Sequence, residues 1–548
     1  MTGISFKRLC ALALLALAGC GAPPPPGGAG AKTAPPPEQL NRIVERYWDE
    51  RLPQDVISPQ ELADSLSVER RYLAEVLKIS REGLDGDAQL TYDIFRRQRE
   101  QAIEGFTFPS ELIPLNPFDG MTQRLVESAL DLRSQKTAAD YGNWLKHIDE
   151  YAKWSRQTIG NMREGVRRGY TLPRSLVERI IPILDALGAD SPGNVLYAPL
   201  HSLPAAISER DRSGAQQLLP AIRALHDYLK QEYLARARTG LALSELPLGA
   251  RWYAYRVDRA TGSRLAPEEI HRIGLERVEH MGTEAPPVAA PDGAPLGSAE
   301  LVNAYRDLAE KVRAALPDLF SEVPKQELEI RSAEWPARPL APLSYRPSGP
   351  AGVPPAVLYV HGAGRGAPAV LVPSFLQRAL PGFHYQIALQ QERLDLPRFR
   401  RFGTEPAFTA GWGMYAASLG EALGMYPDDA AKSEAALEEK RCAVGAVVDT
   451  GIHAKRWTRT QALDYLHAHL TIDEPDAQSL IDWYAANPAD ALACMMGERE
   501  FLALRARSQQ LLGGRFDVRQ FHSEVLKDGA MPLDILEARM RIWMDASK

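Results

Sequence analysis

The stretch that most constrains how this chain can fold is residues 371–426, which reads as two long helices joined by a short linker around Leu396–Pro397. The first carries apolar residues near helical spacing, at Leu376, Leu380, Phe383 and Ile387. Pro381 and Gly382 interrupt it in the middle, where a proline removes one backbone hydrogen bond and costs about 3 kcal/mol. Such a break favours a role in aiming side chains into a cavity.

The rest of the chain predicts a mainly α fold. Residues 38–245 read as helical throughout, in segments that open on proline or acidic residues. Residues 246–365 change character, and Arg251–Val257 alternates with many aromatic residues, which predicts a strand. Three further strands are predicted at residues 326–332, 341–346 and 355–360. Residues 366–548 are helical again, so we expect a large helical body with a small β-sheet subdomain.

The first residues have the features of a bacterial targeting segment. Residues 1–20 contain two basic residues, then a short apolar run, and end in Leu-Ala-Gly-Cys, which resembles a lipobox. Lipoproteins with this motif are cleaved before the cysteine, so Cys20 is the expected site of acylation, and several acyl chains anchor a protein stably. The alternative is an ordinary secretory leader with a chance cysteine. Residues 21–37 form a Pro/Gly/Ala tether that would hold the body off the membrane.

Composition limits the partners and the number of cores. A chain of 548 residues is too long for one small core, so two or three subdomains are expected. The net charge of −6 and the absence of a long basic run argue against nucleic acid as a partner. Apart from the leader, two cysteines remain, Cys442 and Cys494. They could pair in an oxidising compartment, but two separate buried thiols are favoured, because both lie in apolar helical patterns.

Several framework residues in this region match a known family. Pro381, Gly382, His384 and Gln386 match a helix that reads H-E-x-x-P-G-H-H-x-Q. Further matches to the next helix, F-x-E-G-W-A-L-Y-A-E, are Phe408, Gly411, Trp412 and Tyr415. With these motifs the chain resembles the bacterial family numbered 885 among the domains of unknown function, most specifically over residues 240–548. Members look like helical zinc metallopeptidases, so the resemblance implies a zinc site with a catalytic carboxylate.

This chain departs from the family at the positions that would hold the zinc. They carry other side chains: Gln377, Arg378, Phe383, Ala410 and Ala417. Zinc needs three or four N, O or S ligands near tetrahedral geometry, and the one histidine that remains, His384, cannot supply them. The charge of Arg378 would also repel a cation. We therefore expect a metallopeptidase-like scaffold with neither metal nor cofactor, and we interpret His384 as a hydrogen-bonded core histidine.

Other matched residues leave their roles open. Val447–Ala454 reads V-V-D-T-G-I-H-A, as in the family, and places Asp449 and His453 on one helix face. By resemblance they could help bind the substrate or stabilise the transition state. Their alternative role is architectural, with Asp449 pairing with His453 and orienting it. Trp412 and Tyr415 are the candidates for lining a cleft that binds apolar groups.

These observations lead to one main functional hypothesis. We expect a lipid-anchored protein of the bacterial cell envelope, facing the periplasm from the outer membrane, that has lost catalysis and binds a peptide-like ligand or a protein partner. The alternative is a working hydrolase that draws its metal ligands from Glu392, Glu405, Glu421, His361, His384 and His453. A third interpretation is a structural envelope lipoprotein without any small ligand.

Overall fold

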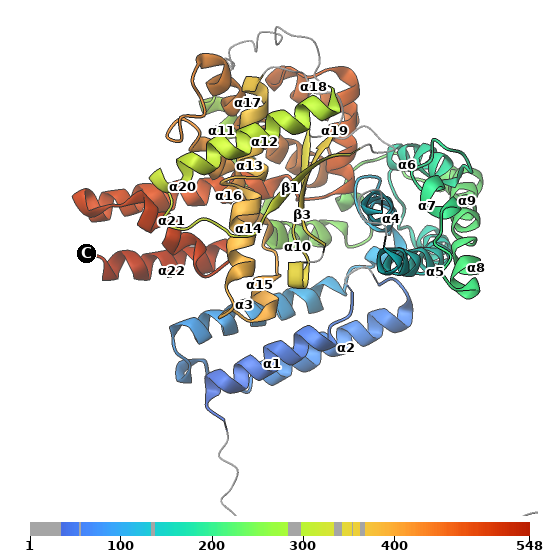
Figure 1. The fold of residues 1–548 in the computed structure, drawn as a ribbon, viewed down its shortest axis with the longest axis horizontal. Helices are drawn as coiled ribbons and strands as arrows, with labels where there is room; N and C mark the ends of the chain where they lie inside the picture. Colours follow the sequence, from blue (N-terminus) through green and yellow to red (C-terminus); the bar gives the residue numbers. More distant parts are fainter. Residues whose placement is uncertain are drawn as a thin grey trace, which may run out of the picture.

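The computed structural model is mainly helical, with a small three-stranded sheet, as the sequence predicts (Figure 1). It describes residues 34–53, 56–132, 137–282, 297–333, 342–352, 354–361 and 368–548. The leader with Cys20 and most of the tether lie outside these ranges. Among the helices in them, none has the length and apolar character needed to cross a membrane.

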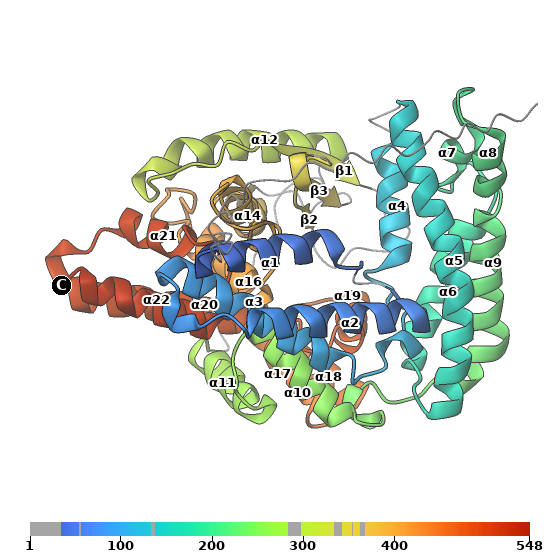
Figure 2. The same cartoon turned by 90° about the horizontal axis from the view of Figure 1, so that it is seen from below.

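Three N-terminal helices lie along the lower edge of the molecule in Figure 1. They are α1 (Pro36–Glu50), α2 (Pro59–Val76) and α3 (Gly86–Gly105). The next helices form a separate lobe with its own apolar core, at the right of Figures 1 and 2. They are α4 (Met121–Asp131), α5 (Ala138–Arg168), α6 (Arg174–Gly188), α7 (Tyr197–His201), α8 (Glu209–Ala215) and α9 (Leu218–Tyr228).

The remaining helices build the central body. They are α10 (Gly249–Thr261), α11 (Pro267–His280), α12 (Ser298–Ala315), α13 (Pro368–Arg378), α14 (Phe383–Glu392), α15 (Arg398–Arg401), α16 (Pro406–Ser418), α17 (Asp429–His453), α18 (Arg459–His469), α19 (Glu474–Ala486), α20 (Leu492–Leu512), α21 (Val518–Leu526) and α22 (Leu533–Ala546). One apolar core joins α1–α3 to α12–α16 and α20–α22, and a second joins α10 and α11 to α17–α19.

The sheet contains the three strands expected after residue 320. Its order is β1 (Leu328–Ala333), β3 (Ala356–His361) and β2 (Leu343–Arg346), with β3 parallel to β1 and antiparallel to β2. Leu328 lies opposite Ala356, and Leu343 lies opposite Val360. Every residue of β3 is buried, as is usual for a central strand.

The prediction of a strand at Arg251–Val257 is wrong, because this segment lies inside helix α10. Its buried residues Tyr253, Val257 and Ala260 recur at the spacing of a helix, and the short alternation of aromatic residues concealed that period. The helix begins at Gly249, where a Cβ atom would lie 2.0 Å from the carbonyl oxygen of Leu243. A close approach of two backbones therefore sets the start of this helix.

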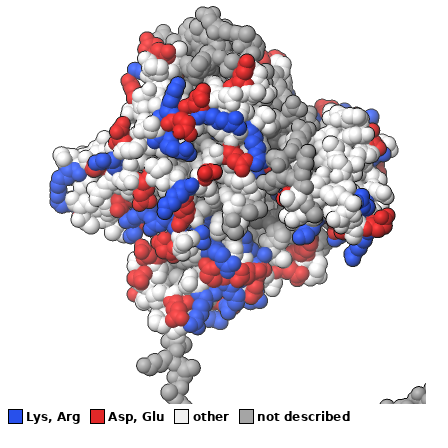
Figure 3. All heavy atoms as spheres, viewed as in Figure 1, with Lys and Arg blue, Asp and Glu red and all other residues white. Residues whose placement is uncertain are grey.

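The surface shown in Figure 3 mixes both signs of charge, with Lys and Arg side chains interspersed among Asp and Glu. Charged side chains of the described residues form ion pairs, such as Arg81 with Asp93 and Arg163 with Glu232. The expectation that the chain does not bind nucleic acid stays a prediction.

Candidate functional site

Gln377, Arg378, Phe383 and Ala410, the group of residues expected to mark the site, lie where α13, α14 and α16 meet. In α13, residues 371–376 are buried, whereas Gln377 and Arg378 at its end are half-buried. In α16, Thr409 and Ala410 are half-buried between buried neighbours. Between residues 371 and 376 of α13 and between residues 411 and 417 of α16 every residue is buried, so the half-buried positions beside these runs are where side chains reach accessible space.

The break between α13 and α14 positions this group. The single long helix expected here is divided, since α13 ends at Arg378 and α14 begins at Phe383, after a cis peptide bond between Leu380 and Pro381. At Gly382, a Cβ atom would lie 1.9 Å from the carbonyl oxygen of Gln377, so a side chain would not fit. The predicted linker at Leu396–Pro397 is also present, and it leads into the short helix α15 rather than directly into α16.

Phe383 fills the space between α13 and α16. A Cβ atom on Gly413 would lie 2.3 Å from Cε1 of Phe383 and 2.8 Å from the carbonyl oxygen of Gln377. Ala410 lies one helical turn before Gly413 and therefore on the same face of α16. The structure thus brings Gln377, Phe383 and Ala410 together around one point.

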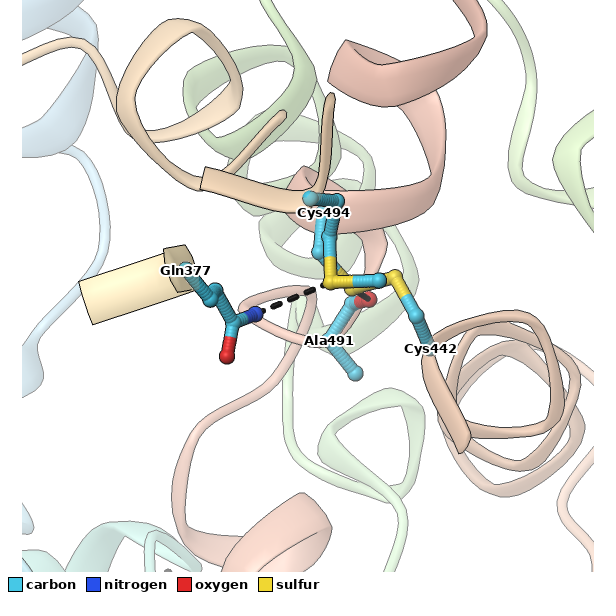
Figure 4. Close-up of a disulfide and its surroundings, with 5 residues drawn as sticks. Gln377, Cys442, Ala491 and Cys494 are labelled. Atoms are coloured by element: carbon cyan, nitrogen blue, oxygen red, sulfur yellow. Dashed lines mark hydrogen bonds between the residues drawn. A yellow bond between two sulfur atoms is a disulfide. The ribbon is translucent and has the colours of Figure 1, made fainter. Parts of the chain in front are cut away.

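Gln377 makes a contact that the sequence analysis missed. Its Nε2 donates a hydrogen bond of 2.9 Å to Sδ of Met414, as Figure 4 shows beside the disulfide. Met414 lies between the matched residues Trp412 and Tyr415, and the packing of α13 against α16 brings it to Gln377. A thioether is a weak acceptor, so the Gln377 amide retains hydrogen-bonding capacity.

Cys442 and Cys494 form a disulfide, so the favoured prediction of two separate thiols is wrong (Figure 4). Their Cα atoms are 6.1 Å apart, although 52 residues separate them along the chain. The bond joins α17 to α20, and Figure 4 shows the side chain of Gln377 directed toward it. Apolar periodicity describes each helix alone and cannot reveal that two distant helices lie side by side.

Arg378 is the one charged residue among Gln377, Arg378, Phe383 and Ala410. Its guanidinium carbon lies 5.7 Å from the centre of the Phe383 ring. Burial lowers the pKa of Arg378, and the opposite charge of Glu438 on α17 partly offsets this. Glu438 itself forms an ion pair with Arg441 at 2.5 Å.

His384 points away from this group and into the fold. It is 0% exposed, its Nδ1 lies 3.2 Å from the Tyr345 hydroxyl, and its Nε2 lies 3.2 Å from the carbonyl oxygen of Gln326. Since a carbonyl can only accept, Nε2 carries the proton and Nδ1 accepts from Tyr345. Burial lowers the pKa of His384 to about 4, so the ring is neutral and ties α14 to the sheet.

His453 is also engaged on both sides of its ring. The backbone N–H of Leu243 donates to its Nδ1 at 2.9 Å, and its Nε2 lies 2.9 Å from the carbonyl oxygen of Tyr484. Burial lowers the pKa of His453 to about 3. The ring therefore holds α17 to the segment before α10 and to α19.

Asp449 lies one turn away on α17 and has different partners. Its carboxyl accepts hydrogen bonds from the Tyr253 hydroxyl at 2.6 Å and from the backbone N–H of Ala489 at 3.0 Å. Burial raises the pKa of Asp449 to about 8, against the effect of these two hydrogen bonds. The hydrogen bonds described for Asp449 and His453 run to these partners and not from one residue to the other.

Trp412 and Tyr415 lie in the helical core, because both are 0% exposed. Nε1 of Trp412 donates to the carbonyl oxygen of Pro381 at 2.9 Å, which braces the break between α13 and α14. The Tyr415 hydroxyl lies 2.7 Å from Nε2 of His522. Neither side chain has free surface for a ligand, so the prediction that they line a cleft is wrong for this conformation.

The other candidate ligands lie apart from one another. Glu392 accepts from the backbone N–H groups of Lys325 and Gln326, at 2.7 and 2.8 Å. Glu405 accepts from Gln98 at 2.8 Å, and Glu421 pairs with Lys432 at 2.7 Å. His361 lies 2.7 Å from the hydroxyl of Ser344. Within the described ranges, no cluster of three or more His, Cys, Asp or Glu residues is arranged to hold a metal ion.

The sequence matches one family model over most of its length. The model described as "Bacterial protein of unknown function (DUF885)" matches residues 37–540. The chain belongs to the DUF885 family.

Two solved structures share the fold. A predicted lipoprotein from Colwellia psychrerythraea is 22% identical with a TM-score of 0.76, over 93% of this chain and 100% of that one. A predicted lipoprotein of unknown function from Shewanella oneidensis is 14% identical with a TM-score of 0.66, over the same shares of the two chains. No curated protein matches the sequence.

Proposed function

We propose that this DUF885 protein is a lipid-anchored protein of the cell envelope that binds a peptide-like ligand or a protein partner without metal-dependent hydrolysis. The observation that carries the proposal is the chemistry of the half-buried positions Gln377, Arg378, Phe383 and Ala410. They present an amide, a guanidinium, a ring and a methyl group. None of these is a zinc ligand of the usual kind.

The contacts around these positions support the same proposal. The Gln377 amide is directed at a thioether, and Phe383 occupies the space over Gly413. The nearest histidine, His384, uses both ring nitrogens to join α14 to the sheet. A metal would gain no ligand from His384 unless these two hydrogen bonds were broken.

The proposed location is the periplasmic side of the outer membrane. It is supported by the lipobox-like end at Cys20, with Gly21 after it, and by the lipoprotein titles of the two proteins that share the fold. The disulfide between Cys442 and Cys494 also fits an oxidising compartment outside the cytoplasm. Labelling cells with a radioactive fatty acid tests the anchor, because Cys20→Ala should abolish incorporation of the label.

Elemental analysis of the purified chain tests the loss of metal chemistry. We expect zinc far below one atom per chain and no aminopeptidase or carboxypeptidase turnover when zinc is added. Stoichiometric zinc together with turnover would contradict the proposal and would favour the alternative of an active hydrolase with ligands from elsewhere.

Restoring the family residues tests where the site was. The variant Gln377→His, Arg378→Glu, Phe383→His and Ala410→Glu should gain zinc affinity, since it places two imidazoles and two carboxylates around one point. The matched control Gln377→Asn, Arg378→Gln, Phe383→Asn and Ala410→Gln has side chains of similar size and should bind none. If the first variant folds and still takes up no zinc, the placement of the site is wrong.

A further inference from the structure

Arg378 differs from the other deeply placed arginines of this chain. Arg99 pairs with Glu69 at 2.7 Å, and Arg400 donates to the Thr91 hydroxyl at 3.0 Å and to the carbonyl oxygen of Asp528 at 2.5 Å. Among the described residues, Arg378 has no hydrogen-bond acceptor and no ion pair, and its guanidinium lies over the ring of Phe383.

An arginine in this position implies a missing acceptor. A buried charge without a hydrogen-bonded partner costs several kcal/mol, so such groups are nearly always paired. Arg378 is half-buried, and burial lowers its pKa. None of its nitrogens is among the fully buried polar atoms without a hydrogen-bond partner, so the guanidinium reaches accessible space.

We propose that Arg378 is the anchor of a binding site for one organic carboxylate, such as the C-terminal carboxylate of a peptide. This inference rests on the proposed function, and it names the ligand class of the same site. The planar guanidinium matches a carboxylate with two parallel hydrogen bonds. The Gln377 amide beside it has a second N–H that can donate to the same ligand.

The surroundings favour a single negative charge with an apolar group attached. The half-buried ring of Phe383 supplies apolar surface beside Gln377 and Arg378, and Ala410 is half-buried on the face of α16 that carries Gly413. Arg378 provides one positive charge, and the negative charge of Glu438 on α17 already acts on it. A doubly charged phosphate would leave excess negative charge there, whereas a carboxylate would balance the arginine.

Calorimetric titration of the full chain in detergent with benzoate tests the site, with benzamide as the neutral probe of the same shape. We expect benzoate to bind and benzamide not to bind. Arg378→Gln should weaken benzoate binding at least about tenfold, because a charge-assisted hydrogen bond is lost. The matched control Arg499→Gln removes an exposed arginine of α20 and should leave binding unchanged. Equal binding of the two probes, no binding of benzoate, or unchanged affinity in Arg378→Gln would each overturn the inference.

A stability measurement covers the case in which Arg378→Gln is misfolded. Arg378→Met keeps an unbranched apolar stem and removes the unpaired charge, so its thermal midpoint without ligand should exceed that of the wild type. Benzoate should raise the midpoint of the wild type and not that of the variant. A lower midpoint for Arg378→Met would show that Arg378 has a structural partner. If the chain contains no zinc and does not bind benzoate, only the inference about Arg378 is contradicted. Stoichiometric zinc with peptidase turnover would instead contradict the proposed function.

Discussion

At the scale of single residues, buried histidines serve as neutral connectors between elements. His384, His453 and His522 are each 0% exposed, and each has both ring nitrogens hydrogen-bonded within the fold. Burial lowers the pKa of His522 to about 4. An unfolded histidine has a pKa near 6.5, so the unfolded chain takes up the proton first as the pH falls.

This difference predicts how His522 affects stability with pH. The stability that the neutral ring contributes is complete above pH 6.5 and is lost as the pH falls towards 4. The destabilisation caused by His522→Gln, measured by urea unfolding, should therefore shrink by about 2 kcal/mol between pH 7.5 and pH 5. The wild type and the His522→Gln variant must be compared at each pH. Burial raises the pKa of Asp449 and Glu498 to about 8, so these two groups change the free energy of unfolding with pH in the opposite direction in both chains.

The matched control is His147→Gln on α5, where the side chain is 52% exposed. Its effect on the free energy of unfolding should stay within a few tenths of a kcal/mol at both pH values. A constant effect of His522→Gln across this range would show that the pKa of this ring is the same in the folded and the unfolded chain, which would contradict the prediction.

At the scale of elements, small residues let α16 and α20 approach closely. A Cβ atom on Gly411 would lie 2.3 Å from the Cα of Gly497, and one on Gly497 would lie 1.9 Å from the carbonyl oxygen of Ala407. Residues 411–417 of α16 are all buried, so this helix has no polar face. The approach places Trp412 and Tyr415 against Phe501 of α20.

We expect Gly497→Ala to lower the free energy of unfolding by roughly 1–3 kcal/mol, because the added methyl group forces the two helices apart. Gly160→Ala on α5 is the matched control, since a Cβ atom there would meet nothing within 4 Å. It should raise the free energy of unfolding by up to about 1 kcal/mol through helix propensity. Urea unfolding of the two variants measures both changes in the free energy of unfolding. Equal changes in the two variants would contradict the close packing of α16 and α20.

At the scale of the whole molecule, segments far apart in the sequence hold the body together. Arg398 donates from its backbone N–H to Glu45 of α1 at 2.8 Å, and Arg97 of α3 pairs with Asp534 of α22 at 2.6 Å. Arg346 of the sheet pairs with Asp131 of α4 at 2.6 Å, which joins the lobe to the body. The helical N-terminal part of the sequence is divided among three apolar cores.

The disulfide adds a covalent link to this framework. Cys442 and Cys494 close a loop of 52 residues, for which the chain-entropy relation gives a contribution of about 4 kcal/mol. Reduction, or the double variant Cys442→Ala and Cys494→Ala, should lower the free energy of unfolding in urea by about that amount. Reductant should have no effect on the double variant. Equal stability of the oxidised and reduced chains would contradict this prediction.

The sequence by itself determined the type of most elements. Helical periodicity and the position of Pro381 indicated a broken helix, and the three strands predicted after residue 320 lie within a few residues of β1, β2 and β3. It also identified Gln377, Arg378, Phe383 and Ala410 as one group, by their difference from a family pattern. Such features depend on local backbone preference and side-chain type, which neighbouring residues carry. The strand prediction for Arg251–Val257 was wrong because seven residues are too few to distinguish the period of a helix from that of a strand.

Only the tertiary structure decided which distant groups meet. Pairing of Cys442 with Cys494, the Met414 sulfur facing Gln377 and the burial of Trp412 and Tyr415 all depend on helices from separate segments packing side by side. The absence of an acceptor for Arg378 among the described residues became visible in the same way. Packing is decided by the shapes of whole helix faces, which no single segment contains.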